Sequence, residues 1–165
     1  MKTIYLVRHA IAAEPGPDYP TDDVRPLTDD RIARLTRQVS GLGALDVAVD
    51  VILTSPLVRC RQTAQILSEG LASHPPVEVL DPLRPGGRIA EVLAGLGPYR
   101  QAGAVALVVH EPSIGVLAAT LIGAQGTVEF KKGAVCRVDV AGLPPRGAGT
   151  LVWMLPPKVL RRLGG

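Results

Sequence analysis

Short hydrophobic runs alternate along the chain with segments whose hydrophobic residues recur at helical spacing. Three of the runs are continuous and rich in β-branched residues, as is typical of strands buried on both faces of a parallel sheet. These runs are Ile4–Val7, Val51–Thr54 and Ala104–Val109. The pattern predicts a further short strand at Val77–Leu80.

The helical spacing predicts four helices between and after these strands. The first covers residues 29–43, with Thr28 at its N-cap position and acidic residues in its first turn. The others are expected at about residues 56–70, 89–96 and 113–122. Strands that alternate with helices predict an α/β layer fold with a mostly parallel sheet.

Two parts of the chain depart from this alternation. Residues 10–27 contain four prolines and show no periodicity, which predicts a long loop of functional importance. Near the other end, Val135–Val140 and Thr150–Leu155 are separated by a Gly- and Pro-rich turn. We expect them to form antiparallel edge strands, followed by a basic tail that begins after Pro157.

Composition narrows the function classes. The 165 residues are enough for one domain, residues 1–165, and 47% hydrophobic with 20% charged residues excludes an intrinsically disordered chain. Only 3% of the residues are aromatic, which speaks against an RNA-binding module that stacks bases. The net charge of +3 is scattered, and most basic residues are arginines, which suit a small phosphate or carboxylate better than nucleic acid.

The two cysteines, Cys60 and Cys136, lie far apart and form no Cys-x-x-Cys pattern. This spacing argues against a disulfide scaffold and against a zinc ribbon, so a reducing cytoplasmic location is expected. No secretory signal and no membrane-spanning run are apparent, and we expect a soluble protein that does not contact membranes.

Polar residues follow the three strongest hydrophobic runs. Arg8 and His9 follow the first run, Arg59 follows the second, and His110 and Glu111 follow the third. A single histidine after a strand is more often a structural group. However, the carboxyl ends of parallel strands share one edge of the sheet, where ligands bind. A nucleophilic imidazole among arginines at that edge predicts phosphoryl chemistry.

The surrounding residues resemble motifs of the histidine phosphatase superfamily, which has the phosphoglycerate mutase-like fold. The run Leu6–Ala10 resembles its Arg-His-Gly signature, with Ala10 in the glycine position. Val24–Thr28, Thr54–Ala64 and Val109–Pro112 follow in the order that the family shows. The short chain and the Arg-Pro-Leu-Thr element are most similar to the SixA-like phosphohistidine phosphatases.

The resemblance implies a three-layer α/β/α sandwich and a role for each matching residue. His9 would carry the phosphoryl group as a phosphohistidine intermediate, and Arg8 and Arg59 would bind the phosphoryl oxygens. His110 would complete the pocket, and Arg25 would reach in from the long loop. No metal ion or other cofactor is implied, and the expected substrate is a phosphorylated protein or a small phosphorylated molecule. The oligomeric state is not indicated.

The general acid and the exact activity stay open. Glu111 could protonate a leaving group, or its charge could simply suit the start of the following helix. Glu14, Asp18 and Asp22 are further candidates in the long loop, where acidic residues are usually only solvated. The leading interpretation is a phosphohistidine phosphatase. The alternatives are a broad-specificity phosphomonoesterase with Glu111 as acid and a non-catalytic phosphate-binding module.

Lys131 and Lys132, just before a predicted strand, form either a solvated turn or a contact with an acidic substrate surface.

Overall fold

A six-stranded sheet forms the centre of the computed structural model, which describes residues 1–165. The strand order is β3-β2-β4-β1-β5-β6, in which β1 to β4 are mutually parallel and β5 is antiparallel to both β1 and β6. The strands are β1 (Lys2–Arg8), β2 (Val51–Thr54), β3 (Val77–Val79), β4 (Ala104–Val109), β5 (Val135–Val140) and β6 (Thr150–Leu155). The mostly parallel sheet is therefore confirmed.

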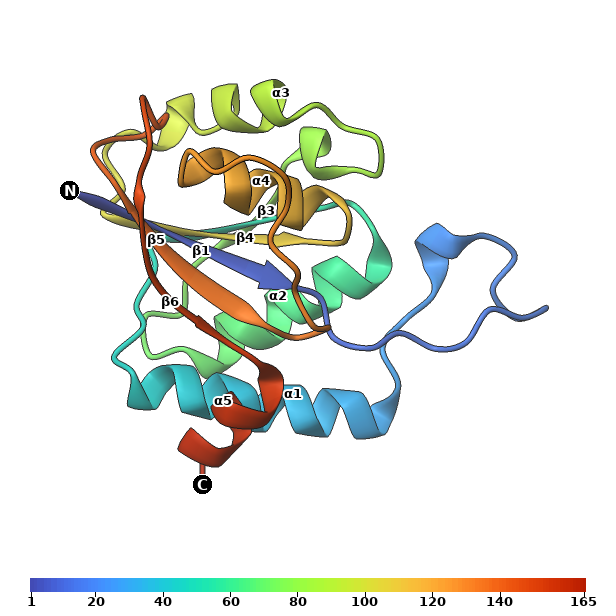
Figure 1. The fold of residues 1–165 in the computed structure, drawn as a ribbon. Coiled ribbons are helices and arrows are strands. Elements are labelled where there is room, and N and C mark those ends of the chain that lie inside the picture. Colours follow the sequence, from blue (N-terminus) through green and yellow to red (C-terminus); the bar gives the residue numbers. More distant parts are fainter.

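Helices cover both faces of this sheet, which gives the three layers seen in Figure 1. Helices α3 and α4 pack on one face, and α1, α2 and α5 pack on the other. Their bounds are α1 (Asp29–Ala44), α2 (Val58–Gly70), α3 (Ile89–Ala94), α4 (Ser113–Leu121) and α5 (Pro157–Leu163). The four predicted helices are present, although α2 begins two residues later than expected.

The central strand β1 shows why its sequence is continuously hydrophobic. Ile4 and Leu6 belong to the core beneath α3 and α4, whereas Tyr5 and Val7 belong to the core beneath α1 and α2. Because successive side chains of a strand point to opposite faces, a strand covered on both faces needs hydrophobic residues at every position.

The last two strands pair antiparallel as expected, but the expectation that both are edge strands is wrong. Of the two, only β6 lies at an edge, because β5 lies between β1 and β6. The basic tail, for which the pattern predicts no element, forms α5, which starts at Pro157, where a first-turn proline is tolerated. Its Leu160 is fully buried against α1, and this contact needs Gly41, because a Cβ atom there would lie 2.0 Å from the Leu160 carbonyl oxygen.

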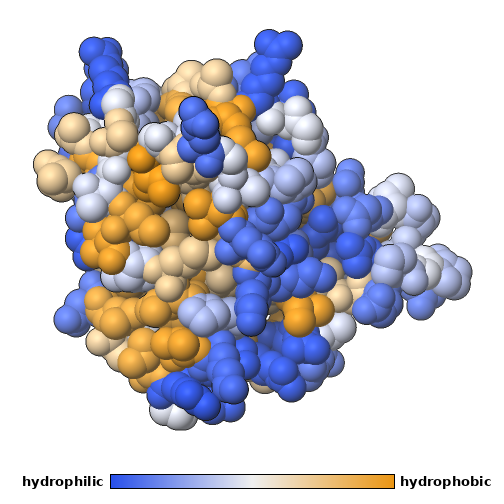
Figure 2. Space-filling model, viewed as in Figure 1, coloured by the Kyte–Doolittle hydropathy of each residue, from blue (hydrophilic) through white to orange (hydrophobic).

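The long loop between β1 and α1 extends away from the layers in Figure 1, and hydrophilic residues gather on that side in Figure 2. The loop closes at its base, where Ala12 and Leu27 form a β-bridge and the Leu27 amide donates to Gln62 Oε1 at 2.7 Å. A short 3₁₀-helix, η1 (Asp22–Val24), lies on its returning arm. The expected loop is confirmed, and it carries Asp22 back toward α2.

None of the helices has the length and hydrophobicity that crossing a bilayer requires.

Gly41→Ala should destabilise the fold by about 1–3 kcal/mol, because its methyl group overpacks the α1–α5 contact. Gly43→Ala is the matched control on the same helix. No atom lies within 4 Å of its added Cβ, so a gain of up to ~1 kcal/mol from helix propensity is expected. Urea unfolding of both variants checks this, and equal stabilities would contradict the close docking of α5.

Candidate active site

Two histidines lie side by side at the carboxyl edge of the sheet. His9 directly follows β1 and His110 directly follows β4, and these strands are paired in parallel register. The His9 amide extends this ladder by donating to the Val109 carbonyl oxygen at 3.1 Å. Both side chains are buried, with 5% and 4% of their surface exposed. The two central strands thus bring together imidazoles that are far apart in sequence.

A backbone hydrogen bond selects the tautomer of His9. Nδ1 lies within hydrogen-bond distance of the Ala10 carbonyl oxygen, which can only accept, so Nδ1 carries the proton. In the neutral ring, Nε2 then holds the lone pair. Arg59 confirms this assignment, because its Nε–H donates to Nε2 at 3.2 Å. An imidazole fixed in this way presents a nucleophilic nitrogen to the site.

Burial keeps this imidazole uncharged. The pKa of His9 is lowered to about 3, and desolvation is the largest cause. The positive charges of Arg59 and Arg8 contribute to this lowering, as does His110, whereas the Ala10 hydrogen bond opposes it. At neutral pH the ring is therefore a free base, as a nucleophile must be.

Arg59 lies in the first turn of α2 and is 7% exposed. Besides its bond to His9, its Nη1 donates to the Asp22 carbonyl oxygen and its Nη2 to Asp22 Oδ2, both at 2.9 Å. Thr63, one turn further along α2, donates to the Arg59 carbonyl oxygen and accepts from the Ala10 amide. Helix α2 therefore fixes both Arg59 and the backbone beside His9.

Arg8 ends β1 and is half-buried. Its Nη1 donates to the Phe130 carbonyl oxygen, and its buried Nε has no protein partner. The backbone at Arg8 and His9 is held by the Gly133 amide, which donates to both carbonyl oxygens. Gly133 has a φ of +86°, and a Cβ there would lie 2.9 Å from Gln38 Nε2, so glycine fits this turn best.

Arg25 reaches the site through Asp22. Its Nε and Nη2 donate to Asp22 Oδ1 at 2.9 and 2.6 Å, and its Nη1 donates to the Ala13 carbonyl oxygen at 2.8 Å. Asp22 thus joins Arg25 to Arg59. Hydrogen bonds from Arg25 lower the pKa of Asp22, with a further contribution from Arg59, so the carboxylate stays ionised.

The second histidine, His110, donates from Nε2 to the Leu83 carbonyl oxygen at 3.0 Å. Burial lowers its pKa, partly offset by hydrogen bonds to backbone carbonyls. The positive charge of Arg59 lowers the pKa further, and the negative charge of Asp22 raises it. His110 therefore belongs to the same electrostatic cluster as His9.

Glu111 lies beside Arg8 and the backbone of Phe130 and Gly115. Desolvation raises the pKa of this carboxyl, and its Oε1 is buried without a hydrogen-bond partner. Arg59, Arg8 and His110 are the groups that lower the pKa of His9 electrostatically. The structure therefore brings three predicted residues, Arg8, Arg59 and His110, close to His9, with Arg25 joined to Arg59 through Asp22 and Glu111 beside Arg8.

Sequence reasoning had weighed Asp22 only as a general acid and had not identified Thr63. Their roles depend on tertiary contacts with Arg59, for which no local pattern exists. The two thiols play no part, because burial raises the pKa of both Cys60 and Cys136 to about 12.

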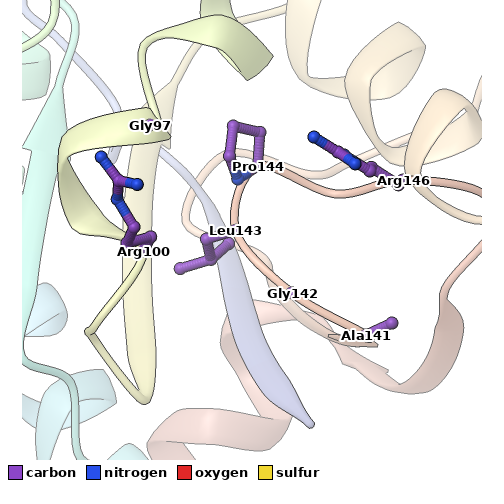
Figure 3. A pocket seen from close by; sticks show the side chains of 7 residues that line it. All are labelled: Gly97, Arg100, Ala141, Gly142, Leu143, Pro144 and Arg146. Carbon is purple, nitrogen blue, oxygen red and sulfur yellow. The ribbon is translucent and has the colours of Figure 1, made fainter.

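The largest hollow of the molecule, about 600 Å³, lies elsewhere. It opens at the opposite end of the sheet, between the turn after β5 and the segment before β4, and Figure 3 shows Arg100 and Arg146 on either side of Pro144. Although this hollow is large, neither His9 nor His110 lines it. We found no cluster of three or more His, Cys, Asp or Glu side chains that could hold a metal ion.

Known proteins with similar sequences belong to one family. The family model of the histidine phosphatase superfamily (branch 1) matches residues 4–85, which include Arg8, His9, Arg25 and Arg59. Over 156 residues the chain is 30% identical to the phosphohistidine phosphatase SixA of Escherichia coli, and the match covers 93% of each protein.

Solved structures agree with the fold. A structure of the protein histidine phosphatase SixA in complex with tungstate superposes with a TM-score of 0.84 at 28% identity, covering 96% of this chain and 99% of the other. The phosphoglycerate mutase of Bacillus anthracis, at 14% identity, shares the fold with a TM-score of 0.65, covering 98% and 96% of the two chains. The expected phosphoglycerate mutase-like architecture is thereby confirmed.

The ring of His9 should stay neutral, with its proton on Nδ1, from pH 8 down to pH 5, because its pKa is lowered to about 3. Ring ¹⁵N–¹H correlation spectra of labelled protein distinguish both tautomers and the imidazolium. His9→Asn identifies the His9 signals by their loss. An imidazolium at pH 6, or a proton on Nε2, would contradict the geometry described here.

Proposed function

Because the chain belongs to the histidine phosphatase superfamily, we propose that it is a phosphohistidine phosphatase whose nucleophile is His9. One observation carries this proposal: the Nε2 lone pair of a buried, neutral imidazole faces an arginine beside a second buried histidine. The substrate is a phosphohistidine side chain of a protein, and the whole chain, residues 1–165, acts as one catalytic domain.

The reaction has two displacement steps. In the first, His9 Nε2 attacks phosphorus, and the bond from phosphorus to the substrate imidazole breaks as that nitrogen takes a proton from solvent. In the second, a water molecule attacks the phosphohistidine on His9, inorganic phosphate leaves, and the water's proton passes to solvent. Nε2 is then restored with its lone pair. The Ala10 carbonyl oxygen holds the Nδ1 proton in place throughout.

Arginines stabilise the charge that spreads over the phosphoryl oxygens. The Nε of Arg59 leaves Nε2 when that nitrogen attacks, and it then donates to a phosphoryl oxygen. Arg8 offers its unpartnered Nε, and His110 completes the pocket. Such groups act strongly here because His9, Arg59 and His110 are almost fully shielded from water.

The carboxyl groups of the site suit a substrate whose leaving group needs little protonation. Asp22 is the acid next to Arg59, but two arginines keep it ionised, so it is a poor proton donor. Burial raises the pKa of Glu111, and the positive charge that acts on this carboxyl is that of Arg8. An imidazole leaving group is less basic than an alkoxide and needs less protonation. This arrangement supports phosphohistidine over an alkyl phosphate ester.

The relatives support the same substrate class. SixA of Escherichia coli is a phosphohistidine phosphatase, and a SixA structure holds tungstate, which is tetrahedral like phosphate. We also propose that the enzyme needs no metal ion and works in the cytoplasm, where its two free, buried thiols stay reduced.

Wild-type enzyme mixed with a ³²P-labelled phosphohistidine peptide should become transiently labelled and release phosphate, whereas His9→Ala should do neither. Rapid-quench sampling checks this, and the label should be acid-labile and alkali-stable, as in a phosphohistidine. Pretreatment of the wild-type enzyme with EDTA should leave the rates of labelling and of phosphate release unchanged. Turnover by His9→Ala would show that His9 is not the nucleophile. Phosphate binding by both proteins without turnover would favour a binding module.

A comparison of substrates tests the role of Glu111. Glu111→Gln should reduce phosphohistidine turnover by less than about threefold, because the imidazole leaving group needs little protonation. Turnover of an alkyl phosphate by wild type should be at least 100-fold slower than that of phosphohistidine. Efficient ester turnover that is abolished in Glu111→Gln would instead establish the phosphomonoesterase with Glu111 as its acid.

A further inference from the structure

We propose that a basic hollow beside His9 binds an acidic segment of the phosphorylated partner protein. This inference rests on the proposed function and specifies which substrates that function serves. The hollow has a volume of about 160 Å³ and starts at Ala10 and Ile11, the two residues that follow the nucleophile. Its other walls come from α1, α5 and the turn before β5, and they consist of Arg31, Arg34, Gln38, Lys132, Pro157 and Arg161.

Four of the eight lining residues are cationic, and none is acidic. Arg31 forms an ion pair with the exposed Asp30 at 3.4 Å, and Arg34 lies near the same carboxylate without pairing with it. Lys132 and Arg161 form no ion pair. Like charges that line one small hollow repel one another, and this repulsion is relieved when an anion binds between them. The hollow therefore favours a negatively charged occupant.

The volume limits the size of that occupant. Pockets for drug-sized ligands and cofactors usually measure about 300–1,000 Å³, so this hollow is too small for a nucleotide. A single carboxylate side chain fits, and neighbouring carboxylates of a peptide can pair with the exposed Arg34 and Lys132 at the rim. The residue chemistry thus selects Asp or Glu side chains of a polypeptide.

The hollow is structurally tied to the reaction centre. Gln38 is only 5% exposed, and its Nε2 donates to the Gly133 carbonyl oxygen at 3.0 Å. The amide of Gly133 donates in turn to the carbonyl oxygens of Arg8 and His9. An acidic segment seated here therefore lies next to the backbone that positions the nucleophile. At about 3.3–3.6 Å per residue, a few extended residues bridge the two sites.

A second pair of arginines provides a matched control. Arg100 and Arg146 are both exposed and flank the hollow at the opposite end of the sheet (Figure 3). A strand of six residues such as β4 spans roughly 20 Å, so one short peptide cannot bind there and present its phosphoryl group to His9. Charge reversal at either pair of positions changes the net charge by the same amount.

The test compares Arg34→Glu/Lys132→Glu with the control Arg100→Glu/Arg146→Glu. Three substrates are used: a phosphohistidine peptide flanked by Glu residues, its counterpart flanked by Gln, and free phosphohistidine. In the first double variant, KM for the Glu-flanked peptide should rise about tenfold, or ~1.4 kcal/mol, with kcat within twofold of wild type. The other two substrates and the control variant should behave like wild type.

Binding is measured separately from turnover. A fluorescein-labelled, unphosphorylated Glu peptide should bind wild type and the control equally, with the affinity falling as salt rises, and it should bind Arg34→Glu/Lys132→Glu about tenfold more weakly. The affinity of the neutral variant Arg34→Gln/Lys132→Gln should lie between those of wild type and the charge-reversed variant. This neutral variant replaces the charge-reversed one in the test if the latter does not fold.

The two proposals fail in different ways. Equal losses for Glu- and Gln-flanked peptides, equal losses in the control variant, or no loss at all would overturn the docking site. If wild type binds the Glu peptide through Arg34 and Lys132 but hydrolyses no phosphohistidine, the proposed function fails while the binding surface stands. If free phosphohistidine is hydrolysed but the Glu peptide does not bind, only the docking site fails.

Discussion

The hydrogen bond between His9 Nδ1 and the Ala10 carbonyl oxygen is the interaction on which the site depends. It holds the proton on one ring nitrogen and so leaves the other, Nε2, as a base that faces Arg59. Burial of the ring complements this bond, because desolvation keeps the imidazole neutral. Neither effect would suffice alone: an exposed ring would titrate near neutral pH, and an unfixed ring would share its proton between both nitrogens.

The sheet order explains how the remaining groups reach this ring. Strand β1 lies between β4 and β5, so His110 and the turn at Gly133 meet His9 from its two sides. Arg59 lies on α2, the helix that follows β2, and β2 borders β4 on the side away from β1. The long loop adds Asp22, which binds Arg59 and Arg25 together. Four separate segments therefore converge around His9 and its arginines.

Much of this arrangement could be predicted from the sequence, for a physical reason. Strands covered on both faces need unbroken hydrophobic runs, so β1, β2 and β4 were evident, and the polar residues after them marked His9 and His110. The hydrophobic pattern does not predict helix α5, because Leu160 is its only buried residue and the rest of its sequence is rich in proline and arginine. The contact of Asp22 with Arg59 joins residues 37 positions apart, and no periodicity encodes such a contact.

The net charge of +3 does not show that some cationic side chains of this protein are ion-paired and others are not. Beside His9, Asp22 pairs with Arg25 and Arg59, so both arginines are held in place. Beside it, Arg34 and Lys132 stay unpaired at the rim of a hollow without acidic lining. The paired cations therefore suit positioning and catalysis, since their geometry is fixed. The unpaired ones suit recognition, since an approaching anion need not displace an internal partner.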